Sequence, residues 1–123
     1  MTVPYSAKRV LVVEDEMMIA LLIEDMLADL GHTVVGQAPT LATALALARA
    51  KAGQFDVAIL DINLGGEHSF PLARQLTDDG VPFVFATGYG AQGVDDDFRH
   101  VITLNKPFHQ ADLGAALERA TTV

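Results

Sequence analysis

Four apolar runs in this chain end in, or are followed closely by, a residue that could do chemistry. These residues carry carboxylate, hydroxyl and amine groups. The runs "RVLVV", "DVAIL", "PFVFAT" and "HVITL" lead to Glu14 and Asp15, to Asp61, to Thr87 and to Lys106, in that order. Each feature alone is common, because a strand-end aspartate often caps a helix and a lysine is usually solvated. Because all of these residues lie at the C-terminal end of an apolar run, the pattern indicates that they share one site.

These residue types match the requirements of phosphoryl chemistry. Carboxylates a few ångströms apart repel each other unless one takes up a proton or a cation lies between them. Hard oxygen ligands without a thiol or imidazole favour Mg²⁺, which keeps positions open for water and phosphate oxygens. An ammonium group and a hydroxyl group then suit the spread charge of a phosphoryl group. Asp61, in the middle of the set, is the best-placed nucleophile.

Apolar strands that alternate with helical patterns must position these residues. The expected strands cover residues 9–13, 32–38, 56–60, 82–87 and 100–104, and the expected helices cover residues 16–30, 40–52, 69–77 and 109–120. Such alternation is typical of an α/β fold with a doubly wound parallel sheet and helices on both faces. Ligands of these folds bind at the carboxyl ends of the strands, where the candidate residues are expected to lie.

Composition limits the classes of function. The 123 residues are enough for one domain with its own core. The formal net charge is −8 and the basic residues are scattered, so nucleic acid is not an expected partner. Cysteine is absent, which excludes disulfides and thiolate chemistry. No apolar run is long enough to span a bilayer and no signal-peptide core is present, so we expect a cytoplasmic protein without a membrane partner.

The motifs "VLVVEDE", "DVAILDINL", "FATG" and "NKPF", in this order and spacing, resemble those of the receiver domains of two-component response regulators. The resemblance covers essentially the whole chain. It implies a single receiver domain over residues 1–123, with a core of about 8–121 and no output domain. It also implies a flavodoxin-like fold with the strand order 2-1-3-4-5, which general descriptions of doubly wound folds already give for a receiver.

The resemblance assigns roles to individual residues. Asp61 resembles the phosphoacceptor, and Glu14 and Asp15 resemble the acidic pair around Mg²⁺. Asn63 resembles the residue whose backbone carbonyl is a further metal ligand. The implied donor is the phosphohistidine of a sensor histidine kinase or of a histidine phosphotransfer protein, and the implied target is an unidentified downstream protein. Slow self-catalysed hydrolysis would end the signal.

Two further site residues lie at or just after the ends of the last two expected strands. Thr87 resembles the hydroxyl that moves to the phosphate, and Lys106 resembles its salt-bridge partner. Receivers usually have a cis peptide bond before the proline of this motif, so the resemblance implies a cis Lys106–Pro107 bond. Position 103 is usually aromatic in receivers, but here it is Thr103, so the usual switch pair lacks a member.

One stretch of the sequence resembles a particular subgroup of receivers, and another differs from the usual receiver sequence. Residues 82–89, "PFVFATGY", resemble the Pro-Phe-x-Phe-Ala-Thr-Gly-Tyr motif of a subgroup of mostly single-domain receivers. Gly65 replaces a common proline and is followed by Gly66, so we expect that loop to be more mobile.

The segment between Thr87 and Lys106 is short for a loop, a helix and a strand. Three glycines in "GYGAQG" each cost up to about 1 kcal/mol in a helix interior, and three aspartates follow them. We therefore expect the fourth helix to be short, irregular or mobile. We further hypothesise that phosphorylation orders residues 88–99, in place of an aromatic rotamer swing.

The first helix carries apolar residues on more than one face. Its expected buried stripe consists of Ile19, Leu22, Ile23, Met26 and Leu30. Met17 and Leu21 then lie on the outer face. These two residues are either ordinary exposed apolar surface or a docking patch for the helical phosphohistidine domain of a kinase.

Three other functions fit parts of the sequence. A pseudo-receiver would bind partners without being phosphorylated. "GYGAQG" matches a dinucleotide-binding motif, but acidic residues follow where pyrophosphate would bind, and only about thirty residues remain. "DIN" resembles the Asp-x-Asp of aspartate-nucleophile phosphatases, but Asn63 cannot protonate a leaving group.

Overall fold

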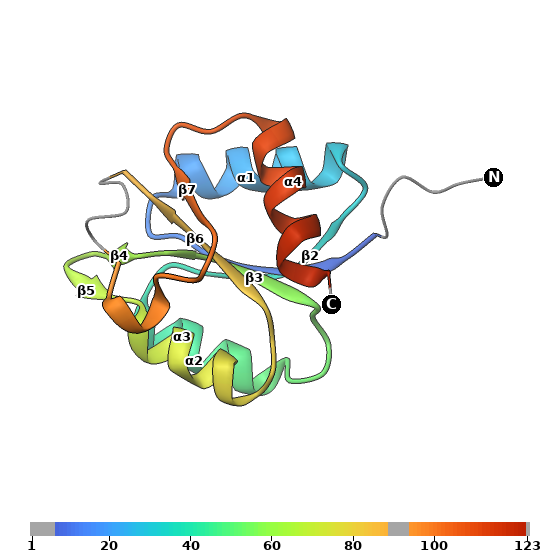
Figure 1. Ribbon diagram of the computed structural model, residues 1–123. Helices are drawn as coiled ribbons and strands as arrows, with labels where there is room; N and C mark the ends of the chain where they lie inside the picture. The colour runs from blue at the N-terminus through green and yellow to red at the C-terminus, as the bar shows by residue number, and fades with distance from the viewer. Residues whose placement is uncertain (1–6, 89–93, 123) are drawn as a thin grey trace.

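The computed structural model describes residues 7–88 and 94–122. A five-stranded sheet forms the middle layer, and α-helices cover both of its faces (Figure 1). Its strands are β1 (Arg9–Val13), β2 (Thr33–Ala38), β3 (Val57–Asp61), β6 (Phe83–Thr87) and β7 (Thr103–Asn105). The α-helices of the described part are α1 (Met17–Asp29), α2 (Leu41–Ala50), α3 (Phe70–Asp78) and α4 (Gln110–Thr121). None of these helices is long and apolar enough to cross a membrane.

The strands lie in the order β2-β1-β3-β6-β7, and every neighbouring pair is parallel. Counted along the chain, the five strands have the order 2-1-3-4-5, so the expected doubly wound fold is confirmed. The chain winds outward in one direction from β1 and in the other from β3. Doubly wound sheets bind ligands at this switch in strand order.

The sheet separates two hydrophobic cores. Along β1, Val10 and Val12 face the core between the sheet and helices α1 and α4, whereas Leu11 and Val13 face the core against α2 and α3 (Figure 1). All four side chains are at most 1% exposed. Alternate residues of the strand are therefore buried on both faces, which explains why the sequence shows little polar alternation.

One expectation for α1 is wrong. Leu22 is 53% exposed, although the helical pattern placed it in the buried stripe. The buried residues of α1 are Ala20, Ile23 and Leu27, which share one narrow face because the sheet and α4 reach only one side of the helix. The opposite side forms what we call the α1 apolar surface, which consists of Met17, Met18, Leu21 and Leu22.

A two-stranded hairpin follows β3 almost directly, and the sequence did not predict it. Strands β4 (Asn63–Leu64) and β5 (Glu67–His68) pair antiparallel around Gly65 and Gly66. The two glycines have φ angles of 60° and 96°. Positive φ at both central residues is what a two-residue type I′ turn requires, and Gly-Gly was the available signal for it. The expected mobility of this loop stays a prediction.

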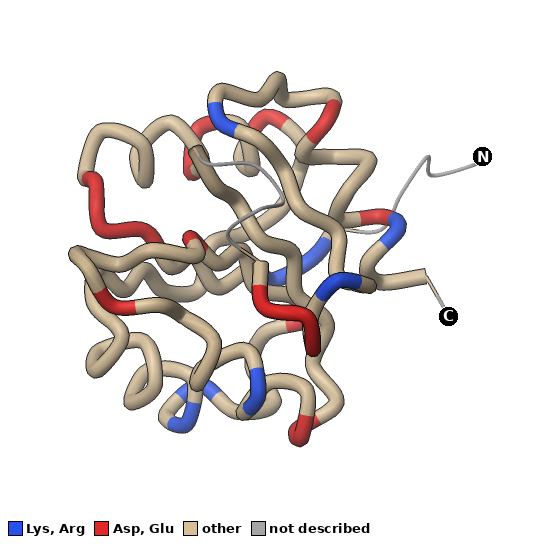
Figure 2. The backbone as a smooth tube through the Cα atoms, turned by 60° about the vertical axis from the view of Figure 1, so that its left-hand side comes forward, with Lys and Arg blue, Asp and Glu red and all other residues tan. Residues whose placement is uncertain are grey.

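The segment between β6 and β7 contains one short helix in its described part. This helix, η2 (Asp96–Phe98), is a 3-10 turn of three residues, and the side chain of Asp95 caps it by accepting the N–H of Asp97. The aspartates form the red stretch that follows the grey trace in Figure 2. The expected short fourth helix is confirmed. Residues 89–93 lie outside the described residues, so the hypothesis that residues 88–99 become ordered stays a prediction.

Phe98 anchors η2 to the core on the α2 and α3 side. Its side chain is 3% exposed, and its ring stacks on that of Phe70 with 5.8 Å between the centroids. The rings of Phe83 and Phe85 meet it edge to face. On the outer side, the guanidinium of Arg74 lies 5.3 Å from the ring centroid, which adds a cation–π contact.

Replacing Phe98 by alanine is expected to lower the free energy of unfolding by about 3 kcal/mol, the low end for a buried aromatic ring, because a short surface turn can partly collapse into the space. Urea unfolding measures the loss. Phe108→Ala is the matched control, since Phe108 is only half-buried on the opposite side of the sheet. Equal losses in the two variants would contradict the anchoring role of Phe98.

Candidate functional site

The chemically active side chains predicted from the sequence meet at the carboxyl ends of the sheet strands. Glu14 and Asp15 follow β1, Asp61 ends β3, Thr87 ends β6, and Lys106 follows β7. A cavity of about 370 Å³ opens at this edge, and the residues that line it include Asp15, Asp61, Asn63, Gly65 and Lys106. Thr87 is buried, at 1% exposure.

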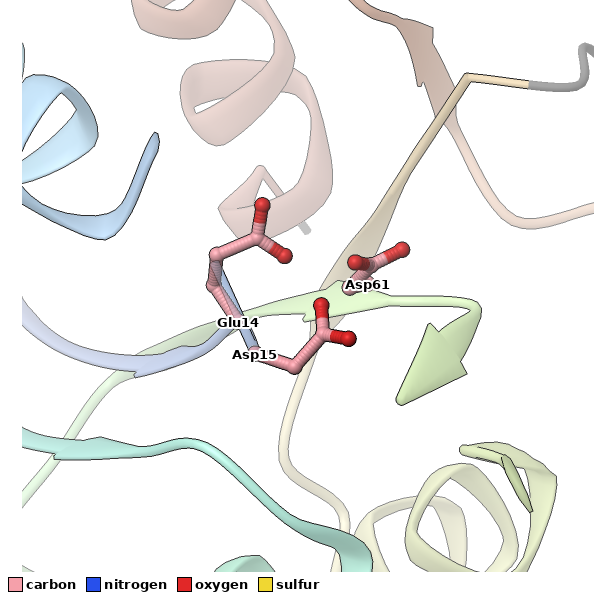
Figure 3. A group of neighbouring side chains, drawn as sticks. All are labelled: Glu14, Asp15 and Asp61. Atoms are coloured by element: carbon pink, nitrogen blue, oxygen red, sulfur yellow. The ribbon is translucent and has the colours of Figure 1, made fainter. Parts of the chain in front are cut away.

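Three carboxylates gather at the ends of β1 and β3. Figure 3 shows Glu14, Asp15 and Asp61 turned toward a common space, and one oxygen of each lies within 4.8 Å of the others. Glu14 is 1% exposed and Asp61 is 8% exposed, whereas Asp15 lies at the surface. Two of the three carboxylates are therefore removed from water, which makes their mutual repulsion stronger.

Lys106 links the two buried carboxylates. Its Nζ lies 2.7 Å from Oε1 of Glu14 and 3.1 Å from Oδ2 of Asp61. The backbone N–H of Lys106 donates to the carbonyl oxygen of Thr87 at 2.8 Å, which holds the lysine against the end of β6. The Lys106–Pro107 peptide bond is cis, as the resemblance implies.

The single positive charge of Lys106 does not balance the negative charges of the three carboxylates. Burial and the neighbouring Asp61 raise the pKa of Glu14 to about 8. Burial also acts to lower the pKa of Lys106, but its contacts with Glu14 and Asp61 outweigh this and the pKa is raised. Among the described residues, Oε2 of Glu14 is buried without a hydrogen-bond partner. Without a second cation, the site therefore retains a proton on Glu14 near neutral pH.

Backbone amides of the β4–β5 hairpin complete the site. The N–H of Gly65 donates to Oδ2 of Asp15 at 2.9 Å, and the N–H of Gly66 donates to Oδ1 of Asn63 at 2.8 Å. The N–H of Asn63 donates to Oδ1 of Asp61 at 3.3 Å. The hairpin is thus hydrogen-bonded to Asp15, which follows β1, and to Asp61, which ends β3.

A family model described as the response regulator receiver domain matches residues 10–118 of the chain. The chain belongs to this receiver domain family. The matched range contains every candidate site residue named above. Curated protein sequences give no match to the chain.

Solved structures of other proteins are similar to this receiver domain. SdrG from Sphingomonas melonis Fr1 is 46% identical, with 95% of this chain and 98% of that chain covered and a TM-score of 0.80. A BeF₃-activated conformation of SdrG from Pseudomonas melonis Fr1 is 47% identical, with 89% and 92% covered and a TM-score of 0.74. The response regulator PhyR from Brucella abortus is 30% identical, with 94% of this chain but only 48% of that chain covered and a TM-score of 0.82.

The donor atoms of this receiver domain suit a hard divalent cation. The cluster offers carboxylate oxygens from Glu14, Asp15 and Asp61, and the chain has no cysteine. The unpartnered Oε2 of Glu14 is the kind of buried acceptor that a cation would satisfy. Oxygen-only ligand sets of this kind select Mg²⁺, Ca²⁺ or Mn²⁺ over softer metals.

Sequence reasoning missed two parts of the receiver site. The backbone amide of Gly65 carries no side-chain signal, and only the Gly-Gly pair marked the turn. Gln37 of β2 donates its Nε2 hydrogen to the backbone carbonyl of Glu14 at 2.8 Å, and nothing in its sequence position indicates this contact.

Proposed function

We propose that this receiver domain accepts a phosphoryl group on Asp61 in a Mg²⁺-dependent reaction and acts as a phosphorylation-controlled interaction switch or phosphorelay element. The proposed donor is the phosphohistidine of a sensor histidine kinase or of a histidine phosphotransfer protein. The contact of Lys106 with both Asp61 and Glu14 supports this function most, because it places an ammonium group beside a strand-end carboxylate inside an acidic cavity.

In the proposed reaction an oxygen of Asp61 attacks the phosphorus, and the bond between the phosphorus and the donor's imidazole nitrogen breaks. The ring nitrogen keeps the electron pair. The ammonium of Lys106, 3.1 Å from Asp61, neutralises charge that the phosphoryl oxygens bring to the cavity. The Thr87 hydroxyl is the proposed donor to one of these oxygens after transfer. Attack of water on the phosphorus then releases inorganic phosphate and restores the Asp61 carboxylate.

Glu14, Asp15, Asp61 and the backbone carbonyl of Asn63 would hold the Mg²⁺. An ion bound there would supply positive charge to offset the negative charge of the phosphoryl oxygens.

The donor is proposed to dock on the α1 apolar surface. Met17 is 65% exposed and Leu21 is 49% exposed, in the first two turns of α1, which begins two residues after Asp15. A groove of about 270 Å³ lies beside this surface, and Leu22 and Lys106 both line it. Lys106 also lines the acidic cavity, so a helix seated on the groove adjoins Asp61.

The chain is further proposed to belong to the receiver subgroup with the Pro-Phe-x-Phe-Ala-Thr-Gly-Tyr motif. Residues 82–89 carry every fixed position of that motif. Within the motif, residues 83–87 form β6, and the next residue, Gly88, lines the cavity, so the motif leads directly to the cavity edge.

The function is tested with a small phosphodonor, so that no cognate kinase is needed. Acetyl phosphate and Mg²⁺ are expected to add one phosphoryl group per chain, measured as intact mass. Beryllofluoride is expected to change the NMR spectrum of the backbone amides. A BeF₃-activated conformation has been solved for SdrG, which is similar to this chain. A pseudo-receiver predicts no change with either reagent.

Mg²⁺ is expected to raise the melting temperature of the wild type and to do so much less in Asp15→Asn. A ligand at 100 times its dissociation constant adds about 2.7 kcal/mol of stability, and the variant loses one metal ligand. Asp25→Asn, which removes an exposed carboxylate of α1 away from the cavity, is the matched control. Equal Mg²⁺ shifts in the wild type and in Asp15→Asn would remove Asp15 from the metal site.

A further inference from the structure

The β4–β5 hairpin reaches Asp15 through one backbone amide. The N–H of Gly65 donates to Oδ2 of Asp15 at 2.9 Å, across 50 positions of sequence. The neighbouring amide, that of Gly66, stays within the hairpin and binds Oδ1 of Asn63. A two-residue turn does not use the N–H groups of its central residues in the strand ladder, so the Gly65 amide is available for an outside acceptor.

Asp15 depends on such a contact more than the other two acids do. Glu14 and Asp61 are buried, and Lys106 binds both of them. Asp15 is exposed. In the described part of the chain, its carboxylate accepts a hydrogen bond from the amide of Gly65. An unrestrained surface aspartate samples several rotamers. A donor fixed by a tight turn selects the rotamer in which the carboxylate is turned toward Asp61 (Figure 3).

The geometry of the turn explains why glycine occupies position 65. Its φ of 60° lies in the left-handed region, which glycine adopts freely and asparagine tolerates. A Cβ at this position would meet no atom within 4 Å, so backbone conformation decides which residues fit, and space does not. Proline, common here in receivers, has no N–H and a φ near −65°, so it can form neither this turn nor this hydrogen bond.

We infer that Gly65 is a positioning residue of the cation site, whose backbone N–H holds Asp15 in the orientation that binds the cation. The hydrogen bond engages Oδ2 and leaves the second carboxylate oxygen for the ion. The hairpin thereby sets the affinity of the site, although none of its side chains needs to touch the metal. This inference rests on the proposed Mg²⁺ site.

The test compares Gly65→Pro, which removes the N–H, with Gly65→Asn, which keeps it. Mg²⁺ is titrated into each unphosphorylated protein, and its dissociation constant is read from amide chemical shifts. Gly65→Pro is expected to bind Mg²⁺ about ten-fold more weakly than the wild type, the lower range for removing a group that orients a metal ligand. Gly65→Asn is expected to bind almost as tightly as the wild type.

The outcomes separate this inference from the proposed function. If the wild type and Gly65→Pro bind Mg²⁺ equally, the inference is wrong and the metal site stands. Equal weakening in both variants also overturns it, because Gly65→Asn keeps the N–H and would then lose Mg²⁺ affinity for a reason other than loss of this hydrogen bond. If the wild type does not bind Mg²⁺, the proposed function itself fails.

A second measurement leaves Gly65 and Gly66 unchanged and is made without Mg²⁺. In the Mg²⁺-free protein, Asp15→Ala is expected to move the amide proton of Gly65 upfield and to leave that of Gly66 in place, because only the first donates to Asp15. Asn63→Ala is expected to move the amide of Gly66 more than that of Gly65. An unchanged Gly65 amide in Asp15→Ala overturns the inference even if Gly65→Pro does not fold.

Discussion

Asp61→Asn is expected to abolish phosphorylation by acetyl phosphate and Mg²⁺, a fall on the order of 10³-fold or more, as for loss of a nucleophile in other covalent catalysts. Asparagine keeps the size of the side chain and an oxygen that can accept the N–H of Asn63, but it lacks the carboxylate that attacks phosphorus. Intact-mass measurement over time gives the rate.

Asp56→Asn is the matched control for this variant. Asp56 precedes the opposite end of β3 and binds Arg9, so its loss is expected to leave phosphorylation intact. Phosphorylation of Asp61→Asn at the wild-type rate would show that another residue is the acceptor. Without divalent cations, Asp61→Asn should melt at the wild-type temperature or higher, because one of three crowded carboxylates is gone. A large loss of stability would show that Asp61 has a structural role.

Lys106→Met is expected to lower the free energy of unfolding by about 2 kcal/mol at pH 9, because the buried carboxylates of Glu14 and Asp61 lose their counter-ion. Folded Glu14 keeps its proton up to a pKa of about 8, whereas its ordinary value is 4.5, so wild-type stability falls as pH rises between these values. In Lys106→Met, which lacks the ammonium group, the free energy of unfolding is expected to go on falling to higher pH. Urea unfolding at several pH values without divalent cations measures both effects.

The double variant Glu14→Gln/Lys106→Met identifies the cause of that loss. If an uncompensated carboxylate causes it, replacing Glu14 by a neutral residue of the same shape should recover most of the stability at pH 9. Lys51→Met, at the C-terminus of α2, should stay within about 0.5 kcal/mol of the wild type. A double variant no more stable than Lys106→Met would show that lost packing, and not charge, is responsible.

Much of the site could be predicted because parallel strands share one direction. Apolar runs that end in Glu14, Asp61 and Thr87 place these residues at one edge of the sheet without knowledge of any contact. The same logic places Lys106. Which acid the lysine binds more closely could not be predicted, because 2.7 Å to Glu14 and 3.1 Å to Asp61 depend on side-chain rotamers.

The parts that escaped prediction depend on backbone groups or on the limits of packing. Every residue except proline has an N–H, so the letter at position 65 does not show that its amide meets Asp15. Strands β4 and β5 have two residues each, too few to produce a periodic pattern. Leu22 was misplaced because helical periodicity shows which residues share a face but does not show how wide a face the neighbouring elements cover.

The division of the interior into two cores gives this receiver a form of modularity. Among the described residues, the side chains that hold α1 and those that hold η2 lie on opposite faces of the sheet and belong to separate hydrophobic clusters. Energetic effects of substitutions at such separated positions add nearly independently. Under the proposed function, the exposed methionines and leucines of α1 can therefore change to fit a new phosphodonor while the aromatic cluster around Phe98 stays as it is. The proposed docking surface and the aromatic anchor of η2 are thus free to evolve at different rates within one small domain.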